Sequence, residues 1–150
     1  YSEIFLNDVN VEKEIRSIKV SNHVSSVATI SFIRKHMVSL QKKISLNKGV
    51  VMDGRDIGSV VFPNAELKLF LNASAEVRAS RRHSEYINQN INVDYSEVLN
   101  NLQSRDLDDS NRLDSPLIVA NDAIEIDNSS MTMDEQFILV KNILKDKFNL

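Results

Sequence analysis

The spacing of hydrophobic residues predicts helices that alternate with short strands. Between about residues 30 and 45, apolar residues recur every three or four positions, the period of an amphipathic helix with one apolar stripe. The stripe consists of Ile30, Ile33, Met37, Leu40 and Ile44. The segment 47–49 (NKG) follows, where a glycine commonly ends a helix.

Three short apolar runs, 49–52, 67–71 and 123–127, are typical of buried strands. Residues 1–11 predict a strand that leads into a turn at Asn7-Asp8, and residues 20–28 predict a weaker helix.

Polar residues mark the starts of three further helices. Ser74 is a candidate N-cap for a helix over 75–87, and Asp94 or Ser96 opens another that runs to about residue 106. Thr132-x-x-Glu135 is a capping-box pattern before the last helix. The predicted buried stripe of that helix is Phe137, Val140, Leu144 and Phe148. Strands alternating with helices predict an α/β fold with a largely parallel sheet.

Composition narrows the function classes. The 150 residues carry a net charge of −3, which gives no electrostatic basis for a dedicated nucleic-acid binder. There is no cysteine, which excludes disulfides, thiolate metal sites and cysteine nucleophiles. The apolar runs are shorter than the ~20 residues that span a bilayer. We expect a cytoplasmic protein with no membrane partner.

The two basic residue types are unevenly distributed. Residues 49–112 contain six of the eight arginines but only one of the ten lysines, Lys68. A site that binds phosphate or carboxylate favours arginine, because the guanidinium is planar, permanently charged and bidentate. The window therefore indicates an anion site, although chance and helix propensity also fit.

The segment 53–58, DGRDIG, directly follows the first predicted buried strand. Ligands of open parallel sheets bind beyond the carboxyl ends of strands. Asp53 and Asp56 offer acceptors there, Arg55 offers a bidentate donor, and the glycines allow close backbone approach. Two alternatives stay open: an internal Asp–Arg pair that braces a loop, and a magnesium site formed by Asp53.

Two further arginine clusters follow. Arg78, Arg81 and Arg82 share one face of the helix over 75–87, where either a bound anion or nearby Glu76 and Glu85 would offset their repulsion.

The segment 104–112, SRDLDDSNR, places Arg105 and Arg112 seven residues apart with aspartates between them. Such a pair suits a mobile lid that closes on phosphates, or equally an exposed, salt-bridged helix end.

These motifs make the sequence similar to bacterial cytidylate kinases over nearly the whole chain. The resemblance covers EIRS with VSNHVSSVA (14–28), the IRK at 33–35, VVMDGRDIGSVVFPNAELKLFLNASAEVRASRR (50–82), SRDLDDSNR (104–112) and PLIVANDAIEID (116–127). The combination of DGRDIG-x-VVFP-x-A with RD-x-x-D-x-NR is highly specific. It implies transfer of a phosphoryl group from ATP, with Mg²⁺, to CMP or dCMP.

The resemblance also implies a role for each matching residue. Ser25, Arg34 and Asp56 would bind cytosine, and Arg55 and Arg112 the CMP phosphate. Arg105 and Asp109 would lie near the ribose and the transferring group, and Asp53 near the magnesium–phosphate centre. The lid over ATP would carry Arg78, Arg81 and Arg82. The Asp56 acceptor favours cytosine over uracil, whose O4 is itself an acceptor.

The implied fold is that of the P-loop kinases, a three-layer parallel sheet with helices on both faces. Residues 1–30 would be the remainder of the CMP-binding insertion, and 31–150 the kinase core with a lid at about 78–112. The complete enzyme is expected to be a monomer.

The sequence departs from the family pattern in three ways. Asn64 replaces the usual aspartate and Ser59 the usual threonine, both tolerable changes. More seriously, the 150 residues contain no G-x-x-x-x-G-K-[ST] loop. We therefore expect a sheet lacking its first strand and a chain that alone is weakly stable and inactive. The alternative function is an inactive pyrimidine-nucleotide-binding remnant.

Overall fold

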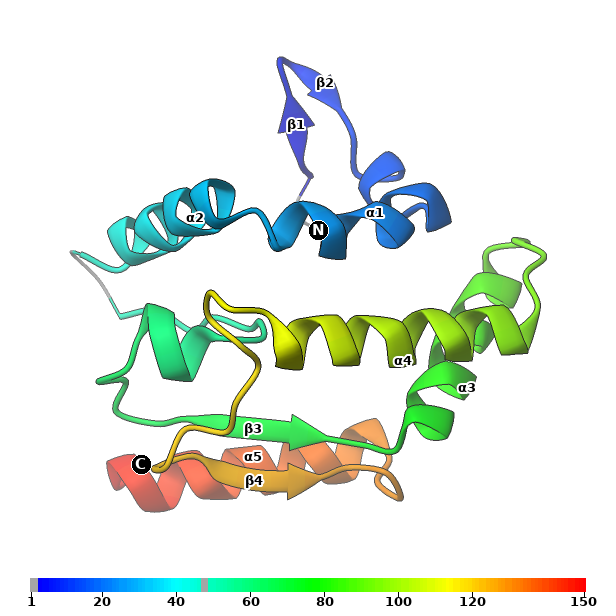
Figure 1. Cartoon of the computed structure of the whole chain (residues 1–150). Helices are drawn as coiled ribbons and strands as arrows, with labels where there is room; N and C mark the ends of the chain where they lie inside the picture. Colours follow the sequence, from blue (N-terminus) through cyan, green and yellow to red (C-terminus); the bar gives the residue numbers. More distant parts are fainter. Residues whose placement is uncertain (1–2, 47–48) are drawn as a thin grey trace.

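The computed structural model describes residues 3–46 and 49–150. From top to bottom, Figure 1 shows a hairpin, a layer of two helices, and a larger body that contains a parallel strand pair. The elements are β1 (Phe5–Leu6), β2 (Val9–Asn10), η1 (Glu14–Arg16), α1 (Ile18–Ala28), α2 (Ser31–Ile44), η2 (Ile57–Val61), β3 (Leu69–Asn72), α3 (Ala75–Asn88), α4 (Tyr95–Asn111), β4 (Ile124–Asp127) and α5 (Met133–Phe148).

The N-terminal hairpin confirms the predicted turn. Asn7 and Asp8 have φ angles of 49° and 63°, the left-handed conformation that tight hairpin turns require and that Asn and Asp tolerate. They join β1 to β2 in antiparallel pairing. The predicted helix over 20–28 is also confirmed as α1, which begins two residues earlier.

The α/β prediction is confirmed by the pair β3 and β4. These strands are parallel, with Leu69 opposite Ile124 and Asn72 opposite Asp127, and α3 and α4 form the crossover between them. In Figure 1, α4 runs on the β3 side of the pair and α5 on the β4 side. The described residues thus contain a two-stranded parallel sheet, which is part of the α/β fold that we expected.

The prediction of a buried strand at 49–52 is wrong. These residues have no ladder partner among those described, and the Val51 side chain is fully exposed. A strand buried on both faces needs neighbours along its edges, and no described strand lies beside this one. The predicted helix end at 47–49 falls partly outside the described residues.

The hydrophobic core lies between α3 and α4. Ala79, Tyr86, Val93 and Val98 are buried together there, and Ile18 of α1 packs against them. The α4 helix runs five residues beyond its predicted end at residue 106, which carries its last turn away from this core. The crossover is therefore the best-packed part of the chain.

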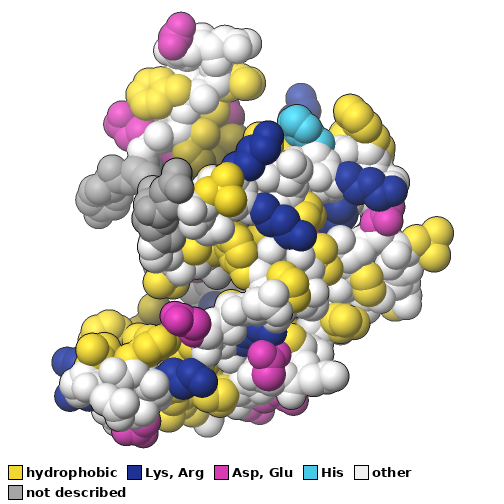
Figure 2. All heavy atoms as spheres, turned by 90° about the vertical axis from the view of Figure 1, so that its left-hand side faces the viewer, with side chains coloured by type: hydrophobic (Ala, Val, Ile, Leu, Met, Phe, Trp, Pro, Cys, Tyr) yellow, Lys and Arg dark blue, Asp and Glu magenta, His cyan; other side chains and the backbone are white. Residues whose placement is uncertain are grey.

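The apolar faces of α2 and α5 stay largely uncovered. The predicted buried stripe of α5 is wrong, since Phe137 is 67% exposed and Phe148 39%. Figure 2 shows hydrophobic side chains at the surface of its lower part, the height at which α5 lies in Figure 1. The accessible surface is 11067 Å², whereas a compact chain of this mass exposes about 7,700 Å². This chain thus buries less apolar surface than a compact domain of its size.

The helix starts follow the predicted caps. Ser74 accepts a hydrogen bond from Val77 N at 3.2 Å, and Asp94, not Ser96, caps α4. Thr132 and Glu135 form the predicted capping box. No helix in the described ranges is both long and apolar enough to cross a membrane.

We predict that Thr132→Ala lowers the free energy of unfolding by about 1 kcal/mol, because the Glu135 amide loses its acceptor. Urea denaturation followed by circular dichroism measures this, with exposed Ser130→Ala as the matched control. The Thr132 backbone N–H holds the Glu135 pKa below its ordinary 4.5. The stabilisation that the Glu135 carboxylate contributes through this bond is thus present above pH 4.5 and is lost as the pH falls through the lowered pKa. Equal stability of Thr132→Ala and wild type would contradict this role.

Candidate functional site

Two buried carboxylates lie at the centre of the candidate site. Asp56 precedes η2 and is 6% exposed, and Asp109 lies in the last turn of α4 and is 4% exposed. Carboxylates are almost never this buried unless they are paired. Both therefore need cations within reach.

Three arginines from three segments supply the cations. Arg112 Nη1 lies 2.7 Å from Asp109 Oδ1, and its Nη2 lies 3.9 Å from Asp56 Oδ1. Arg34 Nη2 on α2 lies 3.2 Å from Asp56 Oδ2, and Arg55 Nε lies 2.6 Å from Asp109 Oδ2. We call these five residues the Arg–Asp cluster.

The end of α4 orients its part of the cluster. Arg112 is the C-cap residue, with φ −64° and ψ 143°, so the backbone leaves the helix just after Asn111. Its Nε donates to Ser115 O at 2.5 Å, which leaves the Nη atoms for the carboxylates. The longer helix also places Arg105 one turn before Asp109, on the same face. Arg112 is thus paired with Asp109, and the site role of Arg105 stays a prediction.

The cluster carries an excess of positive charge. Three arginines face two aspartates, and Arg105 lies close by. Burial, followed by the charge of Arg55, lowers the pKa of Arg105. Burial, followed by the charge of Arg34, lowers the pKa of Arg112. Arginines remain protonated in proteins at neutral pH, so an anion would relieve the repulsion.

Several buried polar atoms of this region make no hydrogen bond among the described residues. They are Arg34 Nε, Asp56 Oδ2, Arg105 Nε, Asp109 Oδ2 and Arg112 Nη2. The two aspartate oxygens and Arg112 Nη2 still lie at the ion-pair distances given above, so the donors Arg34 Nε and Arg105 Nε are the atoms left most open. Native proteins satisfy most buried donors and acceptors, because an unpaired one costs roughly 1–3 kcal/mol. Donors and acceptors left open at one place are typical of a site that a polar ligand completes.

The three arginines of α3 have separate partners. Arg78 binds both oxygens of Asp106, at 3.1 and 2.7 Å, and so joins α3 to α4. Arg81 donates to Asn128 Oδ1 and to Asn128 O, in the loop after β4.

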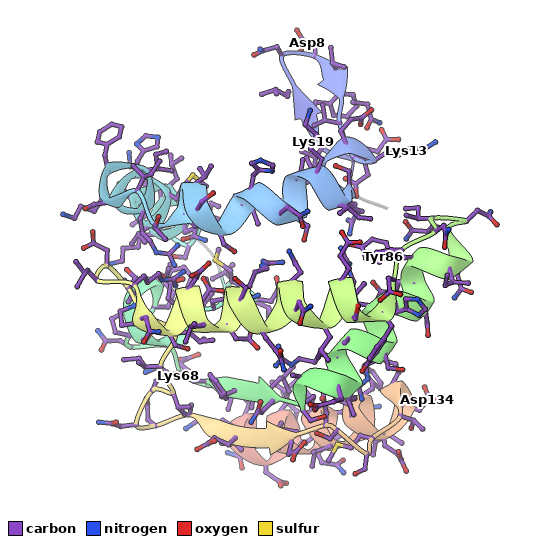
Figure 3. The ribbon with its side chains drawn as sticks, turned by 45° about the vertical axis from the view of Figure 1, so that its right-hand side comes forward. Asp8, Lys13, Lys19, Lys68, Tyr86 and Asp134 are labelled. Atoms are coloured by element: carbon purple, nitrogen blue, oxygen red, sulfur yellow. The ribbon has the colours of Figure 1, made fainter. Side chains whose placement is uncertain are left out.

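Arg82 pairs with Glu85 at 3.0 Å and lies 4.8 Å from the centre of the Tyr86 ring. Figure 3 shows Tyr86 at the α3–α4 junction, at the opposite end of α4 from Lys68. A bound anion is therefore not needed to offset the repulsion among these arginines.

A small cavity lies beside the cluster. It measures about 30 Å³, enough for one or two waters, and lies between α1, α3 and α4. Its polar lining includes Asn22, Asn101, Arg82 and Arg105. The Asn101 amide donates to Asn22 Oδ1 at 2.8 Å, which connects α4 to α1.

Besides Arg105 and the α3 arginines, two more predicted site residues lie outside the cluster. Ser25 is half-buried on α1, and its hydroxyl makes no hydrogen bond to the described cluster residues. Asp53 is exposed. Residues 3–46 and 49–150 contain no group of three or more potential metal ligands, and a role of Asp53 near a magnesium-bound phosphate stays a prediction.

No role for Lys68 follows from the sequence alone, although it is the one lysine in the arginine-rich window 49–112. Its side chain is 7% exposed, and its Nζ binds Asp122 at 2.7 Å. Lys68 is thus a buried, paired lysine close in the chain to Asp56, and only the fold reveals its partner.

Known proteins match the chain along nearly its full length. The family model described as cytidylate kinase matches residues 1–146. The chain belongs to the cytidylate kinase family. It is 57% identical over 146 residues to the cytidylate kinase of Flavobacterium psychrophilum and 53% identical over 146 residues to that of Flavobacterium johnsoniae. With the cytidylate kinase of Parabacteroides distasonis, it shares 54% identity over 134 residues.

The matches cover more of this chain than of its relatives. The two Flavobacterium alignments include 97% of this chain but only 65% and 64% of those kinases. The α/β structure described above is therefore a part of the P-loop-kinase-like fold that membership of the cytidylate kinase family implies.

We predict that Asp109→Asn destabilises the chain by about 3–5 kcal/mol, since it removes one buried carboxylate and leaves Arg55 and Arg112 facing each other. Thermal unfolding measures this. The matched control is Asp108→Asn on the exposed side of the same turn, expected to change stability by about 0.5 kcal/mol or less. Similar melting temperatures for the two variants would mean that the cluster does not hold this end of α4.

Proposed function

We propose that this chain forms the CMP-binding and lid parts of a cytidylate kinase, the enzyme that transfers the γ-phosphoryl group of ATP to CMP or dCMP. The observation that carries the proposal is an arginine-rich, buried cluster in which three arginines face two aspartates and several polar atoms make no hydrogen bond among the described residues. Cytidine monophosphate offers complementary groups: an anionic phosphate, hydroxyls, and a base with an amino donor.

Cytosine recognition is assigned to Asp56, Arg34 and Ser25. Asp56 Oδ2 is buried, and its described partner is Arg34 in an ion pair, without a hydrogen bond, so it keeps acceptor capacity for the N4 amine of cytosine. Arg34 holds this carboxylate at 3.2 Å and so orients it. Ser25, on the neighbouring helix, would reach the base once ligand fills the site.

Phosphate binding is assigned to Arg55 and Arg112, with Arg105 and Asp109 beside the ribose and the transferring group. These arginines surround a site with excess positive charge, which favours a phosphate and the charge that develops during its transfer. The chain's contribution to catalysis is then positioning and charge stabilisation of an in-line transfer.

The donor side is assigned to the α3 arginines and Asp53. Arg78, Arg81 and Arg82 belong to the proposed lid, residues 78–112, which would close over ATP. Mg²⁺ bound with ATP would supply positive charge that offsets the charge of the phosphates. The exposed Asp53 carboxylate fits one ligand position of such an ion, and the phosphates would supply others.

The proposal includes the domain arrangement. Residues 1–30 would be the remainder of the CMP-binding insertion and residues 31–150 the kinase core, in an enzyme that works as a monomer. In Figure 1, α2 lies in the same layer as α1, above the body that contains β3 and β4, so the boundary at residue 30 rests on the family resemblance.

We predict that the chain binds CMP at least tenfold more tightly than UMP, because the uracil O4 would face the Asp56 carboxylate. Isothermal titration calorimetry with CMP, dCMP and UMP measures this. Asp56→Asn should reduce the preference to about threefold or less, since an amide can donate to O4. Exposed Glu66→Gln is the matched control and should keep the full preference. A folded chain that binds none of the nucleotides contradicts the proposal.

The second candidate is a pyrimidine-nucleotide-binding chain without transferase activity. One observation favours it: the 150 residues contain no G-x-x-x-x-G-K-[ST] motif to cradle the ATP phosphates. We predict that these residues alone form no ADP from ATP and CMP in a coupled assay. ADP formation that depends on CMP would overturn this expectation.

A further inference from the structure

We propose that Lys68 is a positioning residue that holds the turn carrying Asp56 in the orientation needed to distinguish cytosine from uracil. This rests on the proposed function of the Arg–Asp cluster. Lys68 touches neither the cluster nor the proposed ligand site, so it would act through the segment 56–63.

The Lys68 ammonium is buried and its three hydrogen-bonding protons have three acceptors. Nζ donates to Pro63 O at 2.6 Å and to Asp122 Oδ1 and Oδ2 at 2.7 and 2.9 Å. Asp122 is largely exposed, and the hydrogen bond from Lys68 lowers the pKa of its carboxyl group. A buried ammonium that loses such partners is strongly destabilised, so these three contacts constrain its position.

The contacts join three segments. Lys68 immediately precedes β3, and its own carbonyl accepts from Ile124 N at 2.9 Å, where β4 begins. Asp122 comes just before β4, and Pro63 ends the segment that follows η2. Figure 3 shows Lys68 where the start of β3 meets the chain that leads into β4. The strand pair is thus the fixed base against which the end of η2 is held.

The lysine stem also supports the middle of the turn. A Cβ added to Gly58 would lie 3.3 Å from Lys68 Cδ and 3.4 Å from its Cγ. These distances are tight, and the stem has little room to move because the side chain is buried. Glycine at position 58 therefore lets η2 lie directly on Lys68.

The turn transmits this position to Asp56 through its backbone. Val60 N and Val61 N both donate to Asp56 O, at 2.9 and 3.2 Å, and Phe62 N donates to Ile57 O at 2.7 Å. Val61 is 2% exposed, which fixes the turn from the inside. Pro63, at one end of the turn, accepts a hydrogen bond from Lys68. Asp56, at the other end, presents its carboxylate to Arg34 and the proposed site.

The principal test is the preference for CMP over UMP in Lys68→Met, which keeps most of the stem but loses the ammonium. We expect the ratio of the two dissociation constants to fall at least fivefold. Exposed Lys141→Met on α5 is the matched control and should retain the wild-type ratio. A residue that served only global stability would lower the melting temperature but leave this ratio unchanged in the folded protein. An unchanged ratio in folded Lys68→Met would therefore overturn the proposal.

A second variant keeps the proposal testable if Lys68→Met does not fold. Gly58→Ala retains every ion pair of Lys68 but presses a methyl group against its stem, and the same loss of preference is expected. Asp122→Asn, which leaves the bond to Pro63, should lower the ratio less than Lys68→Met does. A wild-type ratio in Gly58→Ala would contradict the packing of the turn on Lys68.

Amide hydrogen exchange separates this proposal from the proposed function. In Lys68→Met or Gly58→Ala, the Val60 and Val61 amides should exchange at least tenfold faster than in wild type, without any nucleotide. If the wild-type chain binds no CMP, the proposed function fails, and the exchange rates still decide whether Lys68 holds the turn. Unchanged exchange at both amides would refute the positioning role.

Discussion

The structure depends on the need to compensate two carboxylates that are buried from solvent. Asp56 and Asp109 come from segments far apart in the chain, and Arg112 contacts both. A buried ion pair gains little net stability, but the loss of one partner leaves an uncompensated buried charge. The cluster therefore acts mainly as a constraint that keeps α2, the DGRD segment and α4 in one arrangement.

The same constraint places the cationic groups that the proposed function requires. The aspartates each use part of their acceptor capacity on arginines, and the arginines retain donors that no described residue fills. The site is thus assembled in advance of its ligand, so binding pays less to order its side chains. Lys68 contributes to this order from the opposite side of the Asp56 turn, through the strand pair.

Stability is distributed unevenly over the chain. The α3–α4 crossover has a shared apolar core around Tyr86 and Val98, whereas α2 and α5 expose most of their apolar residues. The proposed lid region thus contains the best-packed core, and the segment 49–52 and the outer helices are the least supported. Segments with few buried contacts open first, since local stability follows the contacts that opening breaks.

The sequence by itself determined most of the local elements. The caps at Ser74, Asp94 and Thr132, the turn at Asn7-Asp8 and the helix periods follow from interactions within a few residues, so they were predictable. The arginine excess over lysine likewise indicated an anion site before any contact was known.

Only the tertiary structure decided which partner each residue has. Within the described ranges it left 49–52 without a strand neighbour and exposed Phe137, because burial depends on what packs against a segment and not on its own pattern. It paired Arg78 with Asp106, and it placed the Lys68 side chain against Gly58, ten residues earlier in the chain. Long-range pairing is set by the geometry of the whole chain, which a local sequence pattern does not contain.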